Sequence, residues 1–166
     1  MQIKTGGSNM LKPAMLYKQE VEKLFAERIY TTDFYYYSGY PFWFRLPEIK
    51  PEENRFDWVS IDEEKVVGYL SYQIDPYTDN VYNFGLISFN KGNLKFVKEV
   101  YDKMAGLITA HHRVEWRAIE GNPAIRGYSN FCKKHNGKIY RLHDAIKDIY
   151  GKYKDIYIFE VINSQN

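Results

Sequence analysis

Cysteine is almost absent from this chain of 166 residues, and because Cys132 is the only one, no internal disulfide can form. A lone thiol is compatible with a reducing compartment. No apolar run is long enough to span a bilayer, and residues 1–9 lack the apolar stretch of a secretion signal. We therefore expect a cytoplasmic protein that does not partner a membrane.

An excess of charge of one sign is also lacking. The 23 basic and 21 acidic residues leave a formal net charge of +2, whereas nucleic-acid-binding domains are usually strongly basic on one face. Four histidines and one cysteine show no metal-ligand spacing, so we expect no metal. Neither a Gly-x-Ser-x-Gly turn nor a Gly-Lys-Ser/Thr phosphate loop occurs, which argues against a serine hydrolase and a P-loop enzyme.

Aromatic side chains, in contrast, are abundant: they make up 17% of the chain, with 16 tyrosines. Tyrosine combines a large apolar ring with a polar tip, so it suits both cores and half-buried pockets. The chain length fits one domain. We expect a single domain over 1–166, with 1–9 flexible.

Hydrophobic periodicity predicts alternating helices and strands. Helices are expected over 17–30 and 94–109 and after Asn122-Pro123, and strands over 56–61, 66–74, 81–89, 114–119, 138–146 and 157–162. The 81–89 strand is almost continuously apolar, which is typical of a central strand covered on both faces. Strand, helix and strand over 81–119 form a crossover, which requires a parallel pair within a mixed sheet.

Three local details of the helices follow from the same patterns. The 94–109 helix is expected to bury one stripe, composed of Leu94, Val97, Tyr101, Met104 and Ile108. Asn122 is expected to cap the next helix, with Pro123 as its first residue. Gly137 is expected to end that helix in a left-handed conformation.

Four segments, in this order, resemble the GNAT superfamily of N-acetyltransferases. They are Val66-Val67-Gly68-Tyr69, the strand–loop–helix from Leu86 to Met104, the helix from Asn122 to Tyr128, and Gly151-Lys152-Tyr153-Lys154-Asp155. The resemblance implies an α+β fold with a mixed sheet of about six to seven strands and helices on both faces. It also implies that the 81–89 and 114–119 strands splay apart and that acetyl-coenzyme A binds between them.

The loop before the 94–109 helix is the expected cofactor site, because free amides at a helix N-terminus favour a phosphate. The resemblance assigns cofactor contacts to eight residues: Ile87, Ser88, Phe89, Asn90, Lys91, Gly92, Asn93 and Asn122. An ordinary strand-to-helix turn is the alternative for the loop, and a helix cap is the alternative for Asn122. If Lys91 takes the place of the family's Gln or Arg, the family's two small residues fall on Leu94 and Phe96, whose side chains would crowd the phosphates. Either the loop is shifted and Gly92 serves alone, or cofactor binding is weakened or lost.

The resemblance also implies the chemistry, in which an amine attacks the thioester directly. Tyr128 is the candidate acid for the leaving thiolate, and a core tyrosine is its alternative reading. A backbone amide near Ile87 or Ser88 is expected to hold the developing oxyanion. The 81–89 strand contains no carboxylate, so the base is left open. Glu115 is expected to be a solvent-facing residue or a partner of Arg117 rather than that base.

The aromatic segment 34–44 lies where the family binds its acceptor. Tyr37, Tyr40 and Trp43 are therefore candidates for the acceptor pocket, or else they cap the open edge of the core. The leading functional interpretation is an N-acetyltransferase that uses acetyl-coenzyme A and a primary amine. The alternatives are a catalytically inactive GNAT-fold binding module and an aromatic-rich nucleic-acid binder, for which the basic and tyrosine-rich residues after Arg126 are the only support.

Overall fold

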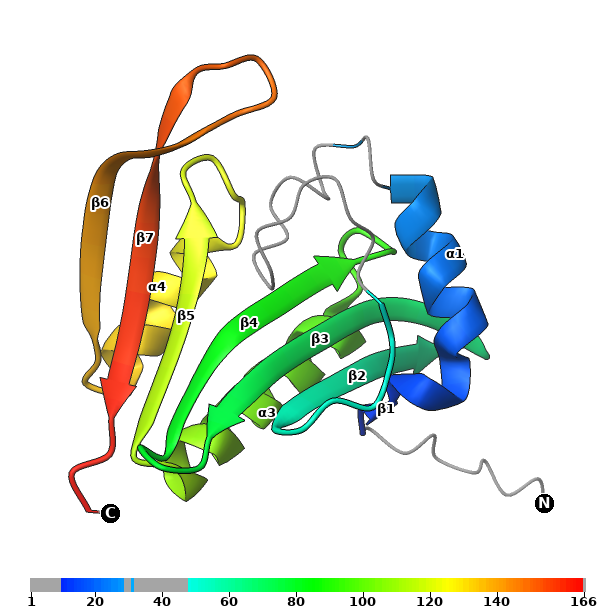
Figure 1. The fold of residues 1–166 in the computed structure, drawn as a ribbon, viewed down its shortest axis with the longest axis horizontal. Coiled ribbons are helices and arrows are strands. Elements are labelled where there is room, and N and C mark those ends of the chain that lie inside the picture. Colours follow the sequence, from blue (N-terminus) through cyan, green and yellow to red (C-terminus); the bar gives the residue numbers. More distant parts are fainter. Residues whose placement is uncertain (1–9, 29–30, 32–47, 166) are drawn as a thin grey trace.

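The computed structural model describes residues 10–28, 31 and 48–165. Their strands form one seven-stranded sheet in the order β1-β2-β3-β4-β5-β7-β6 (Figure 1). The strands are β1 (Lys12–Pro13), β2 (Arg55–Asp62), β3 (Lys65–Asp75), β4 (Asn80–Ser88), β5 (Arg113–Ile119), β6 (Lys138–Lys147) and β7 (Tyr153–Ile162). The described helices are the 3₁₀ helix η1 (Ala14–Tyr17) and the α-helices α1 (Lys18–Arg28), α3 (Leu94–Ala110) and α4 (Ile125–Lys134).

The sheet is mixed, as predicted. β4 and β5 run parallel and are connected through α3, while every other neighbouring pair is antiparallel. No helix within the described ranges has the length and hydrophobicity needed to cross a membrane. The parallel pairing of β4 with β5 confirms the predicted crossover, which places the start of α3 near the C-terminal end of β4.

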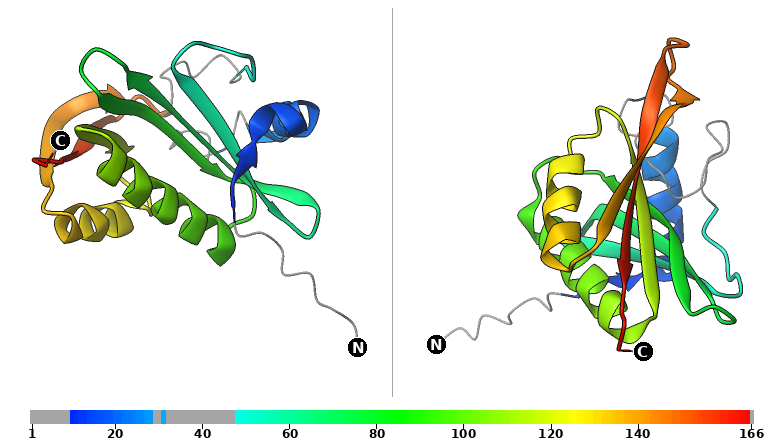
Figure 2. Two further views of the ribbon diagram at one scale, coloured as in Figure 1. Left: turned by 90° about the horizontal axis from the view of Figure 1, so that it is seen from below. Right: turned by 90° about the vertical axis from the view of Figure 1, so that its left-hand side faces the viewer.

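Helices cover both faces of the sheet, which also confirms the prediction. α1 lies on one face and α3 and α4 lie on the other (Figure 2). Each face has its own core: Phe25 and Tyr69 belong to the cluster on the α1 side, and Met104 and Trp116 belong to the larger cluster on the α3 and α4 side. The sheet thus separates two apolar layers.

A β-bulge interrupts β4 at Asn83. Ser71 of β3 opposes Gly85, but Gln73 opposes Tyr82, so β4 has one extra residue in between. Asn83 has a φ of 52°, a left-handed conformation that asparagine tolerates better than most residues. Side chains alternate along a regular strand, and the extra residue shifts that alternation in the second half of β4.

The buried face of α3 differs from the predicted stripe. Leu94 and Val97 are exposed to 80% and 46%, whereas Phe96 is buried and packs onto Gly68 of β3, where a Cβ atom would lie 2.5 Å from its ring. Met104, in contrast, is buried as expected. Ile108 is likewise buried as expected, so the difference lies at the start of the helix, where Gly68 leaves room for the ring of Phe96.

Two predicted end residues of α4 have different roles. The helix begins at Ile125, and Asn122 lies one turn earlier, where its side-chain oxygen accepts from the Ala124 amide at 2.9 Å. Beyond the other end, Asn136 takes the positive φ of 56°. Gly137 is instead needed for close packing, because a Cβ there would lie 2.5 Å from Cys132 Sγ and from a carbonyl oxygen of β7.

Candidate functional site

β4 and β5 separate soon after they begin. Their only paired positions are Asn80 with Arg113 and Val81 with Val114, and beyond these the two strands diverge (Figure 1). The open edge of β4 therefore has backbone groups with no neighbouring strand to bind them. This divergence is the splay that the sequence resemblance predicts.

The Asp79 side chain fastens the closed end of this splay. Its carboxylate binds His111 Nδ1 at 2.7 Å and accepts from the His112 amide at 2.8 Å. These two bonds lower the pKa of Asp79, the His111 bond more strongly. Through these contacts, His111 and His112 hold the start of β5 against the turn before β4.

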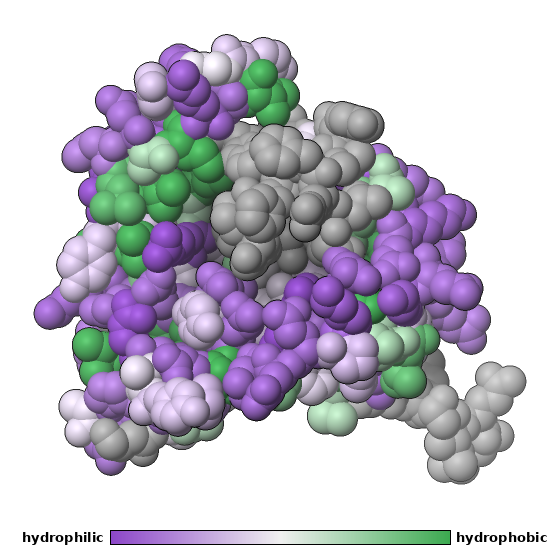
Figure 3. All heavy atoms as spheres, viewed as in Figure 1, coloured by the Kyte–Doolittle hydropathy of each residue, from purple (hydrophilic) through white to green (hydrophobic). Residues whose placement is uncertain are grey.

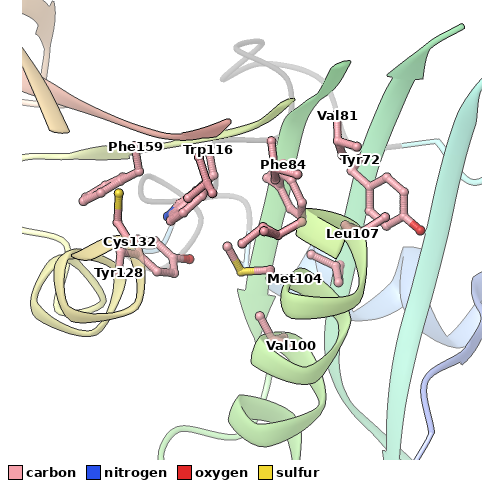
Figure 4. Close-up of a cluster of buried hydrophobic side chains, with 14 of the residues drawn as sticks. Tyr72, Val81, Phe84, Val100, Met104, Leu107, Trp116, Tyr128, Cys132 and Phe159 are labelled. Carbon is pink, nitrogen blue, oxygen red and sulfur yellow. The ribbon is translucent and has the colours of Figure 1, made fainter. Parts of the chain in front are cut away.

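A small pocket lies where the strands diverge, on the face covered by α3 and α4. Its cavity volume is about 10 Å³, roughly the room for one water molecule. Its walls include Leu70, Phe84, Leu86, Met104, Trp116 and Tyr128, and Figure 4 shows several of these side chains converging between β4, β5, α3 and α4. We call this space the β4–β5 pocket.

Arg117 also lines this pocket, and Trp116 and Tyr128 each add a polar atom to its otherwise apolar walls. Both side chains are at least 90% buried. Burial raises the pKa of the Tyr128 hydroxyl well above its ordinary value, and nearby Tyr101 raises it further. The hydroxyl therefore keeps its proton at neutral pH. Within the described part of the chain, Trp116 Nε1 is buried and has no hydrogen-bond partner.

The backbone of β4 presents alternate amides to the space beside β5. The Phe89 amide donates to the Val67 carbonyl of β3 at 2.9 Å. Because amides alternate sides along a strand, the Ile87 amide faces β3 as well, while the Leu86 and Ser88 amides face the open edge. Of the two amides considered for oxyanion binding, Ser88 rather than Ile87 points between the diverging strands.

The loop between β4 and α3 has the shape of an anion site. Gly92 has a φ of 77° with open space where a side chain would stand. Asn93 caps α3 by accepting from the Phe96 amide at 2.9 Å, and the helix itself has no carbonyl partner for the amides of Leu94 and Lys95. Phe96 points into the core, so the predicted crowding by its ring is wrong.

The same loop also carries features that oppose or limit ligand binding. The Asn93 side chain donates to Asp62 at 2.9 Å, which places a carboxylate beside the positive end of the helix dipole. The Asn90 amide donates to Val67 at 3.3 Å, so it is turned toward β3. Lys91 is exposed at the tip and supplies positive charge. The described residues therefore fit a phosphate-bearing arm, with Asp62 as the unfavourable contact.

β2 holds the start of α3 in place through three consecutive residues. Besides the Asp62 contact, the Ile61 carbonyl accepts from Lys95 Nζ and Ser60 Oγ donates to the buried carboxylate of Glu99. These bonds position the helix N-terminus relative to the sheet.

The remaining predicted site residues fall outside the pocket walls or outside the described residues. Asn122 is half-buried in the turn after β5. Glu115 accepts from both Arg113 and Arg117 at 2.7–3.0 Å. Burial raises the pKa of its carboxyl, but the two arginines outweigh this effect and the pKa is lowered. Glu115 is therefore a poor base. Tyr37, Tyr40 and Trp43 lie outside the described residues.

The β6–β7 hairpin extends past the end of β5 (Figure 1) and carries much of the exposed apolar surface. Leu142, Ile149 and Tyr150 are among its exposed side chains, and Figure 3 shows hydrophobic surface over this hairpin. Its Arg141 binds Asp155. The basic and aromatic groups here are thus engaged at least partly within the protein. Among the described residues, no group of histidine, cysteine and carboxylate side chains could hold a metal ion.

Several solved structures that share this fold are named as acetyltransferases. An N-acetyltransferase from Staphylococcus aureus Mu50 matches with a TM-score of 0.64 at 11% identity, over 92% of this chain and 97% of that one. A probable acetyltransferase of the GNAT family from Chromobacterium violaceum ATCC 12472 matches at 0.60 and 16% identity, over 92% and 86%. The ribosomal L7/L12 alpha-N-protein acetyltransferase RimL, in complex with coenzyme A, matches at 0.53 and 13% identity, over 68% and 64%.

These likenesses show that the chain has the GNAT fold, which confirms the fold predicted from sequence. No protein-family model and no curated protein matches the sequence. The family resemblance pointed to Tyr128 but not to Trp116, which alternates with polar residues between Val114 and Ala118 in the sequence of β5. That alternation did show that Trp116 faces inward, but the position of its nitrogen depends on the surrounding fold.

Proposed function

We propose that this protein is an acetyl-coenzyme A-dependent N-acetyltransferase that acts on a primary amine in the cytoplasm. The observation that carries the proposal is the divergence of β4 and β5 after two paired positions, with the start of α3 beside the end of β4. A pantetheine arm needs a site of this kind, open along one strand edge and close to amides that bind phosphate.

Acetyl-coenzyme A, when bound, supplies an activated acyl group. Gly92 and the first amides of α3 would hold its phosphates, and Lys91 would add positive charge. The Leu86 and Ser88 amides at the open edge of β4 would bind the arm or the developing negative charge on the carbonyl oxygen. Asn122 lies in the turn after β5, close enough to the open end to be a further candidate for the arm.

Tyr128 holds a proton at Oη, and we assign it the protonation of the leaving thiolate. The hydroxyl is neutral at pH 7, as a proton donor requires, although burial raises its pKa and so makes it a weaker acid. The amine gives up one proton and the thiolate gains one, so no net proton is consumed. Because β4 carries no carboxylate, we assign the removal of the amine proton to water.

The first test is titration of the purified protein with acetyl-coenzyme A, followed by calorimetry and thermal shift. Micromolar binding supports the proposal and leads to a screen of amine acceptors. The Tyr128→Phe variant should then lose roughly 100-fold or more in kcat with little change in cofactor affinity. Tyr72→Phe is the matched control, since this hydroxyl is also buried but accepts from Trp58 Nε1 at 3.3 Å and lies outside the walls of the β4–β5 pocket.

Absence of binding at millimolar acetyl-coenzyme A would refute the proposal. The inactive binding module would then be the better interpretation, with a fold that retains the splay without the chemistry. Full activity of Tyr128→Phe would refute only the assignment of the proton donor.

A further inference from the structure

The indole of Trp116 presents a hydrogen-bond donor that nothing in the described part of the protein uses. The side chain is 2% exposed, and Nε1 is buried without a partner. An indole N–H only donates, and a buried donor without an acceptor costs free energy in the folded protein. Such a group calls for an explanation, and one explanation is a ligand that supplies the acceptor.

Neighbouring aromatic rings hold the indole in one orientation. Trp116 stacks on Phe159 with ring centroids 5.5 Å apart and an interplanar angle of 12°, and it meets Phe131 edge to face at 5.9 Å. Because these contacts confine the ring, the N–H group keeps a constant direction. Figure 4 shows the indole nitrogen on the side of the ring that is turned toward Tyr128.

Trp116 also stands where the two strands begin to separate. Val114 is the last residue of β5 paired with β4, and Trp116 is the next side chain of β5 on the same face. It lies in the wall of the β4–β5 pocket with Phe84, Leu86 and Met104. These apolar neighbours disfavour a charged acceptor, and Arg117, which also lines the pocket, has its guanidinium paired with Glu115. The atom that accepts from Nε1 should therefore be a neutral carbonyl oxygen.

We propose that Trp116 Nε1 donates a hydrogen bond to the carbonyl oxygen of the acyl thioester, so that Trp116 distinguishes acyl-coenzyme A from free coenzyme A. This inference rests on the proposed function. The phosphates of acetyl-coenzyme A are assigned to the start of α3 beyond Ser88. The acyl group is at the opposite end of acetyl-coenzyme A from these phosphates. The narrow end of the splay, where Trp116 lies, is the corresponding end of the site.

A donor in these surroundings binds the reactive state more tightly than the ground state. Negative charge grows on the carbonyl oxygen when an amine attacks, and a fixed donor in an apolar pocket stabilises it without reorganisation. The amides of β4 and Trp116 Nε1 would then approach this oxygen from different strands.

The test compares acetyl-coenzyme A with coenzyme A on the wild type and on Trp116→Phe, using calorimetry. We expect Trp116→Phe to bind acetyl-coenzyme A roughly fivefold to tenfold more weakly and coenzyme A about as well as the wild type. Trp58→Phe is the matched control, because Trp58 Nε1 already donates to Tyr72 at 3.3 Å. This variant should keep the wild-type preference between the two ligands.

A second measurement needs no substitution in the protein under test. The indole N–H resonance of Trp116, assigned with the two variants, should move downfield when acetyl-coenzyme A is added and should stay in place with coenzyme A. A shift of equal size with both ligands would overturn the proposal, and so would binding of both ligands without any shift. Binding without a shift would mean that the N–H group rests against the ring of Tyr128, whose centroid lies 6.4 Å from that of Trp116. Failure of the wild type to bind either ligand would overturn the proposed function, and this inference with it.

Discussion

Replacing Gly68 with alanine should destabilise the protein through a single steric conflict. A Cβ atom at this position would lie 2.5 Å from three ring atoms of Phe96, closer than van der Waals contact allows. The ring cannot move outward freely, because Phe96 is 2% exposed and its helix is tied to β2 by the Ser60–Glu99 and Lys95–Ile61 bonds. Either the ring must leave its rotamer or α3 must shift away from the sheet.

The cost follows from comparable changes in packed cores. Adding a methyl group to a filled interior costs roughly 1–3 kcal/mol. For a chain of this length, each kcal/mol lowers Tm by about 2–4 °C, so Gly68→Ala should melt roughly 2–12 °C below the wild type. Phe96→Leu should make room for the methyl group, and the double variant should be more stable than the two single effects predict, by about 1 kcal/mol.

The assay is urea unfolding of the four proteins in this cycle, with Gly106→Ala as the matched control. Gly106 lies in α3, as Phe96 does, but nothing lies within 4 Å of the position that a Cβ atom would take there. Alanine in an open helical position should stabilise by about 0.5–1 kcal/mol. If Gly68→Ala unfolds at the wild-type urea concentration, or if the two changes are additive, then Phe96 does not rest on Gly68.

Three further predictions concern charged groups. Asp62→Asn removes the carboxylate beside the start of α3 and should tighten acetyl-coenzyme A binding about twofold to fivefold; calorimetry giving an unchanged Kd would contradict this. Ser60→Ala leaves Glu99 buried without its donor and should cost about 1–3 kcal/mol, whereas Ser60→Ala with Glu99→Leu should recover much of that loss in urea unfolding. The bond to His111 lowers the pKa of the Asp79 carboxyl below its ordinary value of 3.8. The stabilisation that ionised Asp79 contributes is therefore complete above pH 3.8 and is lost as the pH falls through the lowered pKa. Asp79→Asn, compared in urea at pH 5 and pH 3, should lose less stability than the wild type on acidification.

Much of the architecture could be predicted from local sequence. Helix α3 over Leu94–Ala110 and strand β5 over Arg113–Ile119 lie within one residue of their predicted bounds, because their apolar periodicities and the loops between them are clear. The parallel crossover followed from that order, since a strand–helix–strand unit usually connects two parallel strands. Boundaries were less certain where pairing decides them, and β7 begins at Tyr153, four residues before the predicted 157.

The sequence by itself thus determined the order of elements and the mixed sheet, because these depend on periodicity and connection length, while the expected place of the splay came from the family resemblance. Only the tertiary structure decided which side chains occupy the site. Phe96 turned inward because Gly68 left room for its ring, and the Ser88 amide faces the open edge because of its register with β3. Trp116 became a site residue because its nitrogen was left without an acceptor. These outcomes arise from contacts between segments far apart in the chain, where neither propensity nor spacing carries information.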